Sequence, residues 1–252
     1  MIRYLFRRLL ATIPVVLLTS IIVFGLMRLL PGDPVIMMLG SAQTEVSDET
    51  VAQLRKDAGL DKPIYEQYAV WMERVLVGDF GRSSQNREPV LGILMPRIWP
   101  TVQIGLSAWL LAIFLAIPIG IFSAAQQGTW KDSAGTLFSL VGASMPYFLV
   151  GGLLISVISI ELRLLPASGF VAPWDDPWGS FRSTILPAIT LSLGFAAIIA
   201  RQTRSSFADV LQQAYIKTAR AKGVDERGIL LKHAFKNAIL PIVTLLGFVD
   251  KG

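Results

Sequence analysis

Long stretches without a charged side chain dominate this sequence and predict helices that cross a membrane. Four intervals, 9–27, 98–130, 133–160 and 183–200, contain no Asp, Glu, Lys, Arg or His. A helix needs roughly 20 largely apolar residues to cross the hydrocarbon core of a bilayer, and all four intervals are close to that length or exceed it. A fifth apolar run, 237–249, is shorter. We expect it to be too short to span, so that the chain ends part-way through its next helix.

The composition supports the same class of fold. Hydrophobic residues make up 53% of the 252 residues, charged residues make up only 16%, and the mean hydropathy is +0.56. Soluble domains carry about 25% charged residues, so this chain has too few polar side chains to cover a water-facing surface. A disordered regulator, a typical cytosolic enzyme and a nucleic-acid-binding module are therefore excluded. The sequence predicts an all-α polytopic membrane protein, a bundle of kinked transmembrane helices.

The charge-free intervals also predict the domain organisation. We expect a cytoplasmic N-terminus and first transmembrane helix at 1–30, an extracytoplasmic helical loop at 31–97 and a transmembrane core at 98–252. A cleaved signal peptide is the alternative for the first segment, because basic residues precede its apolar run. We favour a retained helix, since the run is longer than that of a signal peptide and no small-x-small cleavage site follows it.

Counts of lysine and arginine predict that the N-terminus is cytoplasmic. The segments 1–8, 125–133 and 201–236 then lie inside and carry 12 basic residues, whereas the short outer loop 161–182 carries two. Short loops rich in Lys and Arg remain in the cytoplasm, while long loops such as 28–97 translocate largely regardless of charge. On this orientation the basic segment 201–236 faces the cytoplasm.

Small residues recur at four-residue spacing in two of the predicted spans. One row is Ala108, Ala112, Ala116, Gly120 and Ala124, and the other is Ala188, Ser192, Ala196 and Ala200. Because such rows let helix backbones approach closely in lipid, we expect both on packed faces inside the bundle. Prolines at 14, 118, 146 and 187 also lie within the spans, and we expect them to kink their helices.

The sequence predicts no catalytic chemistry and no cofactor. The chain has no cysteine and a single histidine, His233, which excludes thiolate chemistry and a His-rich metal centre. The middle of each span lacks ionisable groups, which disfavours a polytopic membrane enzyme and an ion-coupled carrier. A Gly-x4-Gly-Lys-Ser/Thr phosphate loop is also absent from the sequence, so the chain cannot itself cradle the phosphates of ATP.

The region 31–97 has the character of a soluble segment and predicts two helices, over 48–58 and 63–77. The second helix carries an apolar face formed by Ile64, Tyr68, Trp71 and Val75. Two interpretations remain open for this region: a cap that packs on the bundle, or a landing surface for an external partner. In the later outer loop, Trp174 and Trp178 are predicted to anchor the chain at the membrane interface.

The stretch 201–237 is predicted to form a cytoplasmic helical hairpin. We expect the preceding helix to continue to Lys222, Gly223 to end it, and Asp225 to cap a second short helix. Both helices combine apolar residues with Lys and Arg, and apolar groups on a water-facing hairpin require a partner. The partner is either another protein or the surface of anionic lipid.

The motifs of this hairpin resemble a known family. Residues 218–223 read Thr-Ala-Arg-Ala-Lys-Gly, and residues 233–238 read His-Ala-Phe-Lys-Asn-Ala. Both resemble the EAA-type loop of inner-membrane permease subunits of ATP-binding-cassette (ABC) importers, in the dipeptide, oligopeptide and nickel branch. Lys236 stands where the general motif has proline. Four further segments resemble the same branch in the same order: Leu30–Pro34, Gly59–Pro63, Gly78–Ser83 and Leu165–Gly169.

The resemblance implies a transporter subunit that acts mechanically. It implies that separate cytoplasmic ABC ATPases hydrolyse ATP and receive the hairpin, that a second permease subunit is present, and that an extracytoplasmic substrate-binding protein delivers the substrate. Membrane lipid is the remaining expected partner. Nucleic acid is not expected to bind. The residues implied for ATPase coupling are Ala219, Ala221, Gly223, Asp225, Ile229, Leu230 and His233. Among these, the two alanines, Ile229 and Leu230 are the expected docking contacts.

The expected function is transport of di- or oligopeptides, although glutathione and nickel complexes also fit this branch. The alternative is a membrane scaffold or assembly protein with a basic hairpin that binds lipid or protein. Members of the family usually have six spans, so the resemblance also implies that this chain stops inside its fifth.

Overall fold

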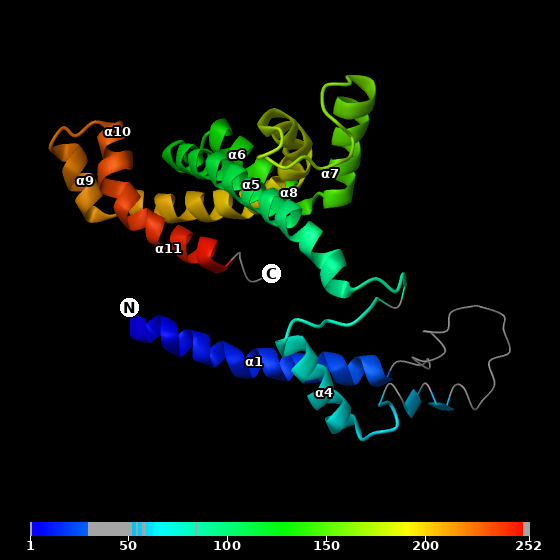
Figure 1. Ribbon diagram of the computed structural model, residues 1–252. Coiled ribbons are helices and arrows are strands. Elements are labelled where there is room, and N and C mark those ends of the chain that lie inside the picture. Colours follow the sequence, from blue (N-terminus) through cyan, green and yellow to red (C-terminus); the bar gives the residue numbers. More distant parts are fainter. Residues whose placement is uncertain (1, 30–51, 54, 57–58, 84, 249–252) are drawn as a thin grey trace. The chain divides into compact units, whose positions relative to one another are not determined.

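A computed structural model describes residues 2–29, 52–53, 55–56, 59–83 and 85–248 of the chain (Figure 1). In these ranges the regular elements are helices, with one isolated bridge between Arg82 and Pro89. The predicted all-α fold is therefore confirmed for the described part of the chain. The helix predicted over 48–58 lies largely outside the described residues, and the segment Leu30–Pro34 lies wholly outside them. The chain divides into two compact units, 1–97 and 98–252.

In the first unit, one long helix carries the first predicted span and a shorter helix packs against it. The long helix is α1, Ile2–Leu29, and the shorter one is α4, Ile64–Leu76. The Tyr68 hydroxyl lies 2.7 Å from the Ser20 hydroxyl. The Phe24 ring centroid lies 5.5 Å from that of Tyr68 and 5.6 Å from that of Trp71. The predicted helix over 63–77 is confirmed, and the middle of its apolar face contacts α1.

The second unit is organised along one long central helix, α8. Its elements in order are α5 (Val90–Ala125, which begins in the first unit), α6 (Trp130–Ser144), α7 (Tyr147–Leu154), η1 (Ile155–Glu161), α8 (Pro177–Leu211), α9 (Ala214–Ala221), α10 (Glu226–Gly228), η2 (Ile229–Ala234) and α11 (Phe235–Phe248). Buried residues of α8 form the core together with those of α5, α9, η2 and α11. The segments η1 and η2 are π-helical, with backbone hydrogen bonds that span five residues instead of four.

The two rows of small residues are buried along their whole length, as predicted. At Gly120, α5 lies directly against α8. A Cβ atom built on Gly120 would lie 2.5 Å from the Thr203 Cβ atom and 2.7 Å from the Ala200 carbonyl oxygen. Only glycine fits there, because any side chain would collide with the backbone of α8. The rows therefore bring α5 and α8 into close contact.

Four helices among the described residues are long and apolar enough to cross a membrane: Phe6–Leu29, Val90–Ala125, Pro177–Leu211 and Glu226–Gly247. The first three contain predicted spans. The fourth corrects the prediction that the last apolar run is too short. That run joins the second arm of the hairpin in one helical stretch of 22 residues, which has the length and composition of a span.

The predicted span 133–160 is broken rather than kinked. α6 ends at Ser144, α7 begins at Tyr147, and the two parts are bent by 100°. Proline has no backbone N–H and disfavours a helical conformation at the residue before it, and Met145 is accordingly extended with ψ 125°. Pro146 therefore ends one helix and starts another, and the segment is either a broken span or a re-entrant loop.

Candidate functional site

The predicted hairpin is present, but its first arm is a separate short helix. α8 ends at Leu211, and Gln213 adopts an extended conformation (φ −65°, ψ 148°) before α9 begins at Ala214. The prediction of one continuous helix through Lys222 is therefore wrong. The hairpin, residues 214–234, consists of α9, the turn after it, α10 and η2, and it lies at one end of α8 (Figure 1).

Gly223 ends the first arm, as predicted. Its φ of +82° lies in the left-handed region. The Gly223 N–H donates to the Arg220 carbonyl oxygen at 3.0 Å, and the Val224 N–H donates to the Ala219 carbonyl oxygen at 3.2 Å. Such paired bonds close a helix C-terminus when the residue after the helix is left-handed. A Cβ atom at Gly223 would meet nothing within 4 Å, so the requirement for glycine is one of backbone conformation and not of space.

The second arm begins at Asp225, but the predicted side-chain cap is not formed. Asp225 occupies the N-cap position with extended backbone, and its carboxylate makes no capping hydrogen bond. Its backbone carbonyl accepts from the Ile229 N–H at 2.9 Å instead. The second arm is also longer than predicted, because α10, η2 and α11 follow one another without a break from Glu226 to Phe248.

The two arms meet through buried apolar side chains. Ile216 and Ala219 of α9 and Ile229 and Ala234 of η2 are all buried. Ile229 is fully buried, so in this conformation it offers no surface to a partner, and Ala219 offers very little. Both were expected to be docking contacts. Their placement means that any effect they have on coupling passes through the packing of the hairpin.

The other predicted coupling residues lie nearer the surface. Ala221, Gly223 and Asp225 are exposed at the tip, while Leu230 and His233 are half-buried. Sequence reasoning missed Leu231, whose side chain is 68% exposed beside the basic residues of the second arm. The available signal was its position: Ile229, Leu230 and Leu231 are consecutive, and successive residues of a helix point about 100° apart, so the three side chains cannot all face the other arm.

Polar contacts hold the two ends of the hairpin. Near the tip, the Arg220 guanidinium donates to both carboxylate oxygens of Glu226, at 2.7 and 3.1 Å. These hydrogen bonds raise the pKa of Arg220 above its ordinary value. At the open end, Asn237 of α11, just after the hairpin, donates its side-chain N–H to the Tyr215 hydroxyl at 2.7 Å. Neither pair could be predicted from the sequence, because each joins residues on different helices.

The hairpin is fixed to the end of α8. The Ser206 hydroxyl donates to the Ala238 carbonyl oxygen at 2.8 Å, and the buried Phe207 ring packs against the Phe235 ring. The exposed sides of the arms and of the start of α11 carry basic residues: Lys217, Lys222, Arg227, Lys232 and Lys236. The result is a preformed, positively charged hairpin whose tip is open to a partner.

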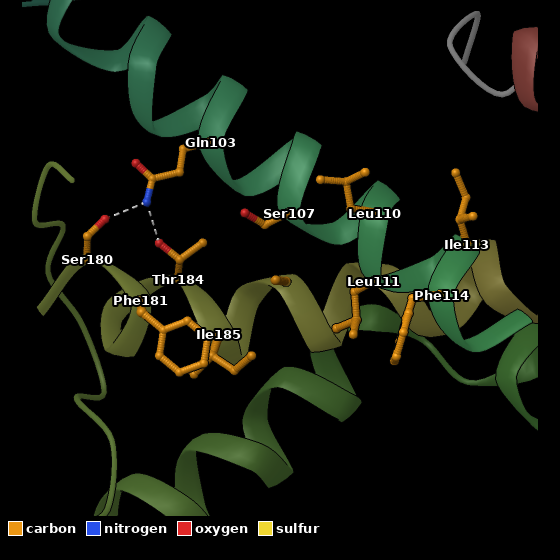
Figure 2. A pocket seen from close by; sticks show the side chains of 11 residues that line it. Gln103, Ser107, Leu110, Leu111, Ile113, Phe114, Ser180, Phe181, Thr184 and Ile185 are labelled. Atoms are coloured by element: carbon orange, nitrogen blue, oxygen red, sulfur yellow. Dashed lines mark hydrogen bonds between the residues drawn. The ribbon is translucent and has the colours of Figure 1, made fainter. Parts of the chain in front are cut away.

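A groove runs between α5 and α8 in another part of the second unit (Figure 2). It has a volume of about 670 Å³, and most of its lining is apolar. Four polar side chains also line it: Gln103, Ser107, Ser180 and Thr184. The Gln103 side-chain N–H₂ donates to the Ser180 hydroxyl at 2.7 Å and to the Thr184 hydroxyl at 2.8 Å. The groove therefore combines an apolar wall with one ordered polar cluster.

Neither the hairpin nor the groove has the ligand set of a metal centre. Among the described residues, no three His, Cys, Asp or Glu side chains come together where they could hold a metal ion.

Comparison with known families matches almost the whole chain. Residues 116–249 match the family described as "Binding-protein-dependent transport system inner membrane component", and residues 1–105 match the corresponding N-terminal family. The chain belongs to this permease family. It is thus an inner-membrane subunit of an ABC importer in the peptide branch, as its hairpin motifs indicated.

Individual relatives of the permease carry a more specific name. The glutathione transport system permease proteins GsiC of Salmonella choleraesuis (strain SC-B67) and Salmonella typhimurium (strain LT2) are 38% identical to it over 247 residues. GsiC of Escherichia coli (strain K12) is 37% identical. Each alignment covers 98% of this chain and 77% of the relative.

Family membership decides two of the earlier expectations. The permease is a multi-pass inner-membrane protein and not an enzyme, since ATP hydrolysis in these transporters belongs to a separate ATPase subunit. Its class of partner follows as well: an ATPase and a substrate-binding protein.

Proposed function

We propose that this permease couples ATP hydrolysis by cytoplasmic ABC ATPase subunits to the import of a peptide-like solute, and that the hairpin is the element that contacts the ATPase. The N-terminus and the hairpin lie on the cytoplasmic side, and a second permease subunit pairs with this one. A binding protein delivers the substrate from the other side of the membrane.

The observation that carries the proposal is the build of the hairpin. Its arms are held together by buried residues, by the Arg220–Glu226 pair and by the Tyr215–Asn237 hydrogen bond. It is also attached to α8 through Phe207. A hairpin held in this way is rigid, so a displacement imposed by a partner is transmitted to α8 and does not merely bend the hairpin. Its exposed tip and basic sides suit a protein groove of complementary shape and charge.

The groove between α5 and α8 supports a peptide-like substrate. Binding sites for small molecules are mostly apolar, occupy about 300–1,000 Å³ and use a few well-placed polar groups for orientation. This groove meets each criterion, and its amide and hydroxyl groups match the hydrogen-bonding groups of a peptide backbone. We propose that it lines part of the substrate pathway. Glutathione, the solute named for the relatives, is one member of the proposed class.

Substitution at Gly223 tests the coupling role. Gly223→Val places a β-branched residue at a φ of +82°, which L-residues with branched side chains avoid. We expect the variant to insert into the membrane and to lose ATP-dependent uptake in a reconstituted transporter that contains the ATPase, the second permease subunit and the binding protein. Gly223→Asn is the matched control, since asparagine tolerates the left-handed region far better.

Two outcomes would count against the proposal. Uptake by Gly223→Val equal to that of the unaltered chain would remove the hairpin from the coupling step. Failure of the unaltered chain to co-purify with an ATPase, in the presence of its second permease subunit, would favour a scaffold.

A further inference from the structure

One turn of α8, residues 203–207, contacts three neighbouring helices at once. Thr203 packs against Gly120 of α5, and Ser206 and Phe207 contact α11, which continues the second arm of the hairpin. The remaining contact is made by Arg204, which reaches Asp132 in the first turn of α6. This turn is therefore the place where the hairpin, α8 and the α5–α6 turn are joined.

The ion pair between Arg204 and Asp132 is bidentate, and each oxygen of the Asp132 carboxylate accepts two hydrogen bonds. The Arg204 Nε atom lies 2.5 Å from Asp132 Oδ1, and a terminal guanidinium nitrogen lies 2.7 Å from Oδ2. Two further donors reach the same carboxylate. The Ser123 hydroxyl donates to Oδ1 at 2.8 Å, and the Gly128 backbone N–H donates to Oδ2 at 3.1 Å. The carboxylate thus ties α8 to the end of α5, to the α5–α6 turn and to α6.

Stability alone does not account for a pair of this kind. Asp132 is only 5% exposed, and Arg204 is partly buried. Desolvating two charges costs about as much as their attraction returns, so an apolar pair of similar volume is often equally stable. What a bidentate pair adds is a fixed distance and a fixed orientation between the two elements that carry it. A fixed distance and orientation allow the movement of one helix to be transmitted to the other.

The position of Arg204 along the chain indicates which motion the pair transmits. Arg204 lies seven residues before Leu211, where α8 ends and the chain passes directly into the hairpin. A displacement of the hairpin would therefore move the end of α8 and, through Arg204, act on Asp132. On the other side, α6 leads through the 100° bend at Pro146 to α7.

We propose that the Asp132–Arg204 pair transmits hairpin displacement from α8 to the α5–α6 turn, so that α5 and α6 move with the hairpin during transport. The inference rests on the proposed function, in which an ATPase moves the hairpin. Both residues act as positioning residues, because neither contacts ATP or substrate in this role.

The decisive variant removes both charges together. In Asp132→Asn/Arg204→Gln no buried charge is left unpaired, so the helices keep their packing while the rigid connection is lost. The readout is the number of substrate molecules taken up per ATP hydrolysed by the complete reconstituted transporter. We expect this ratio to fall by about tenfold, a value inside the usual range for coupling between distant sites. Assembly and the rate of ATP hydrolysis remain close to those of the unaltered transporter.

Two further variants separate transmission from folding. Arg204→Lys keeps the charge but loses the planar fork, and we expect an intermediate ratio from a normally assembled complex. Lys131→Gln removes a cation next to Asp132 without touching its hydrogen bonds, and it serves as the control with an unchanged ratio. If the double variant fails to assemble, Arg204→Lys decides the question.

The outcomes distinguish this inference from the proposed function. A double variant that assembles and retains the full ratio would overturn the inference and leave the proposed function intact, as would an unchanged ratio in Arg204→Lys. An unaltered transporter that shows no ATP-dependent uptake would overturn the proposed function, and the inference with it.

Discussion

The Phe207 ring at the end of α8 packs against the Phe235 ring at the start of α11, with centroids 6.1 Å apart and ring planes at 61°. The hairpin, residues 214–234, lies within the segment of chain between these two residues. Because both of its ends are fixed at this contact, the hairpin is attached to α8 as a closed loop. Motion of the hairpin relative to α8 would have to separate the rings.

The first prediction concerns Phe207. Its side chain has no exposed surface, so Phe207→Ala leaves a cavity where the hairpin joins α8. Truncating a buried phenylalanine costs about 3–5 kcal/mol. We expect a lower thermal unfolding temperature in detergent and faster cleavage of the hairpin by protease. Phe122→Ala, at a half-exposed ring of α5, is the control and should have a much smaller effect. Equal losses in the two variants would show that Phe207 has no special role.

The second prediction compares two glycines of the same helix. A Cβ atom at Gly120 would lie 2.7 Å from a backbone oxygen of α8, whereas a Cβ atom at Gly105 would meet nothing within 4 Å. Gly120→Ala therefore forces α5 and α8 apart, and overpacking of this kind costs about 1–3 kcal/mol. Gly105→Ala should be neutral or slightly stabilising, because alanine favours a helix more than glycine does. Thermal unfolding of both purified variants measures the difference, and a stable Gly120→Ala protein would contradict the contact.

Features that depend on local sequence were predictable from the sequence. The rows of small residues follow from helical periodicity, and their burial is confirmed at every position. The end of the first arm at Gly223 follows from the conformational freedom of glycine. Both rest on residues within a few positions of one another, where spacing determines which side chains share a face.

Features that join distant residues were not predictable. Asp132 and Arg204 are 72 positions apart, and in the sequence each resembles an ordinary charge beside a membrane span. The Gln103–Thr184 contact joins residues 81 positions apart. The effect of each proline was not predictable either: Pro146 separates two helices, whereas Pro187 lies inside α8. The residue type alone does not say which outcome the surrounding packing will select.

A third prediction tests the groove between α5 and α8. The chain contains no cysteine, so a single introduced cysteine reports on its own surroundings. Ser107 lines the groove, whereas its neighbour Leu106 points about 100° further around α5 at nearly the same depth. If water fills the groove during transport, Ser107→Cys reacts with a water-soluble, membrane-impermeant thiol reagent, because thiolates form only where water is present. Leu106→Cys should not react.

Substrate provides the second part of this test. A transported peptide should slow the labelling of Ser107→Cys, and an unrelated solute should not. Equal labelling of the two cysteines, or labelling that substrate leaves unchanged, would place the groove against lipid or a neighbouring subunit instead.

The fourth prediction concerns the side of the membrane on which the hairpin lies. Lys222 is exposed at the end of the first arm, and Asp175 is exposed in the loop before α8. α8 and the residues that flank it separate these two positions, and α8 is long enough to cross the bilayer. In intact cells, an impermeant thiol reagent should label Asp175→Cys and leave Lys222→Cys unlabelled, and inverted vesicles should give the opposite pattern. The basic residues on the hairpin favour the cytoplasmic side, where short Lys- and Arg-rich segments are retained. Labelling of Lys222→Cys from outside would put the hairpin out of reach of any cytoplasmic ATPase, and the proposed coupling would then be impossible.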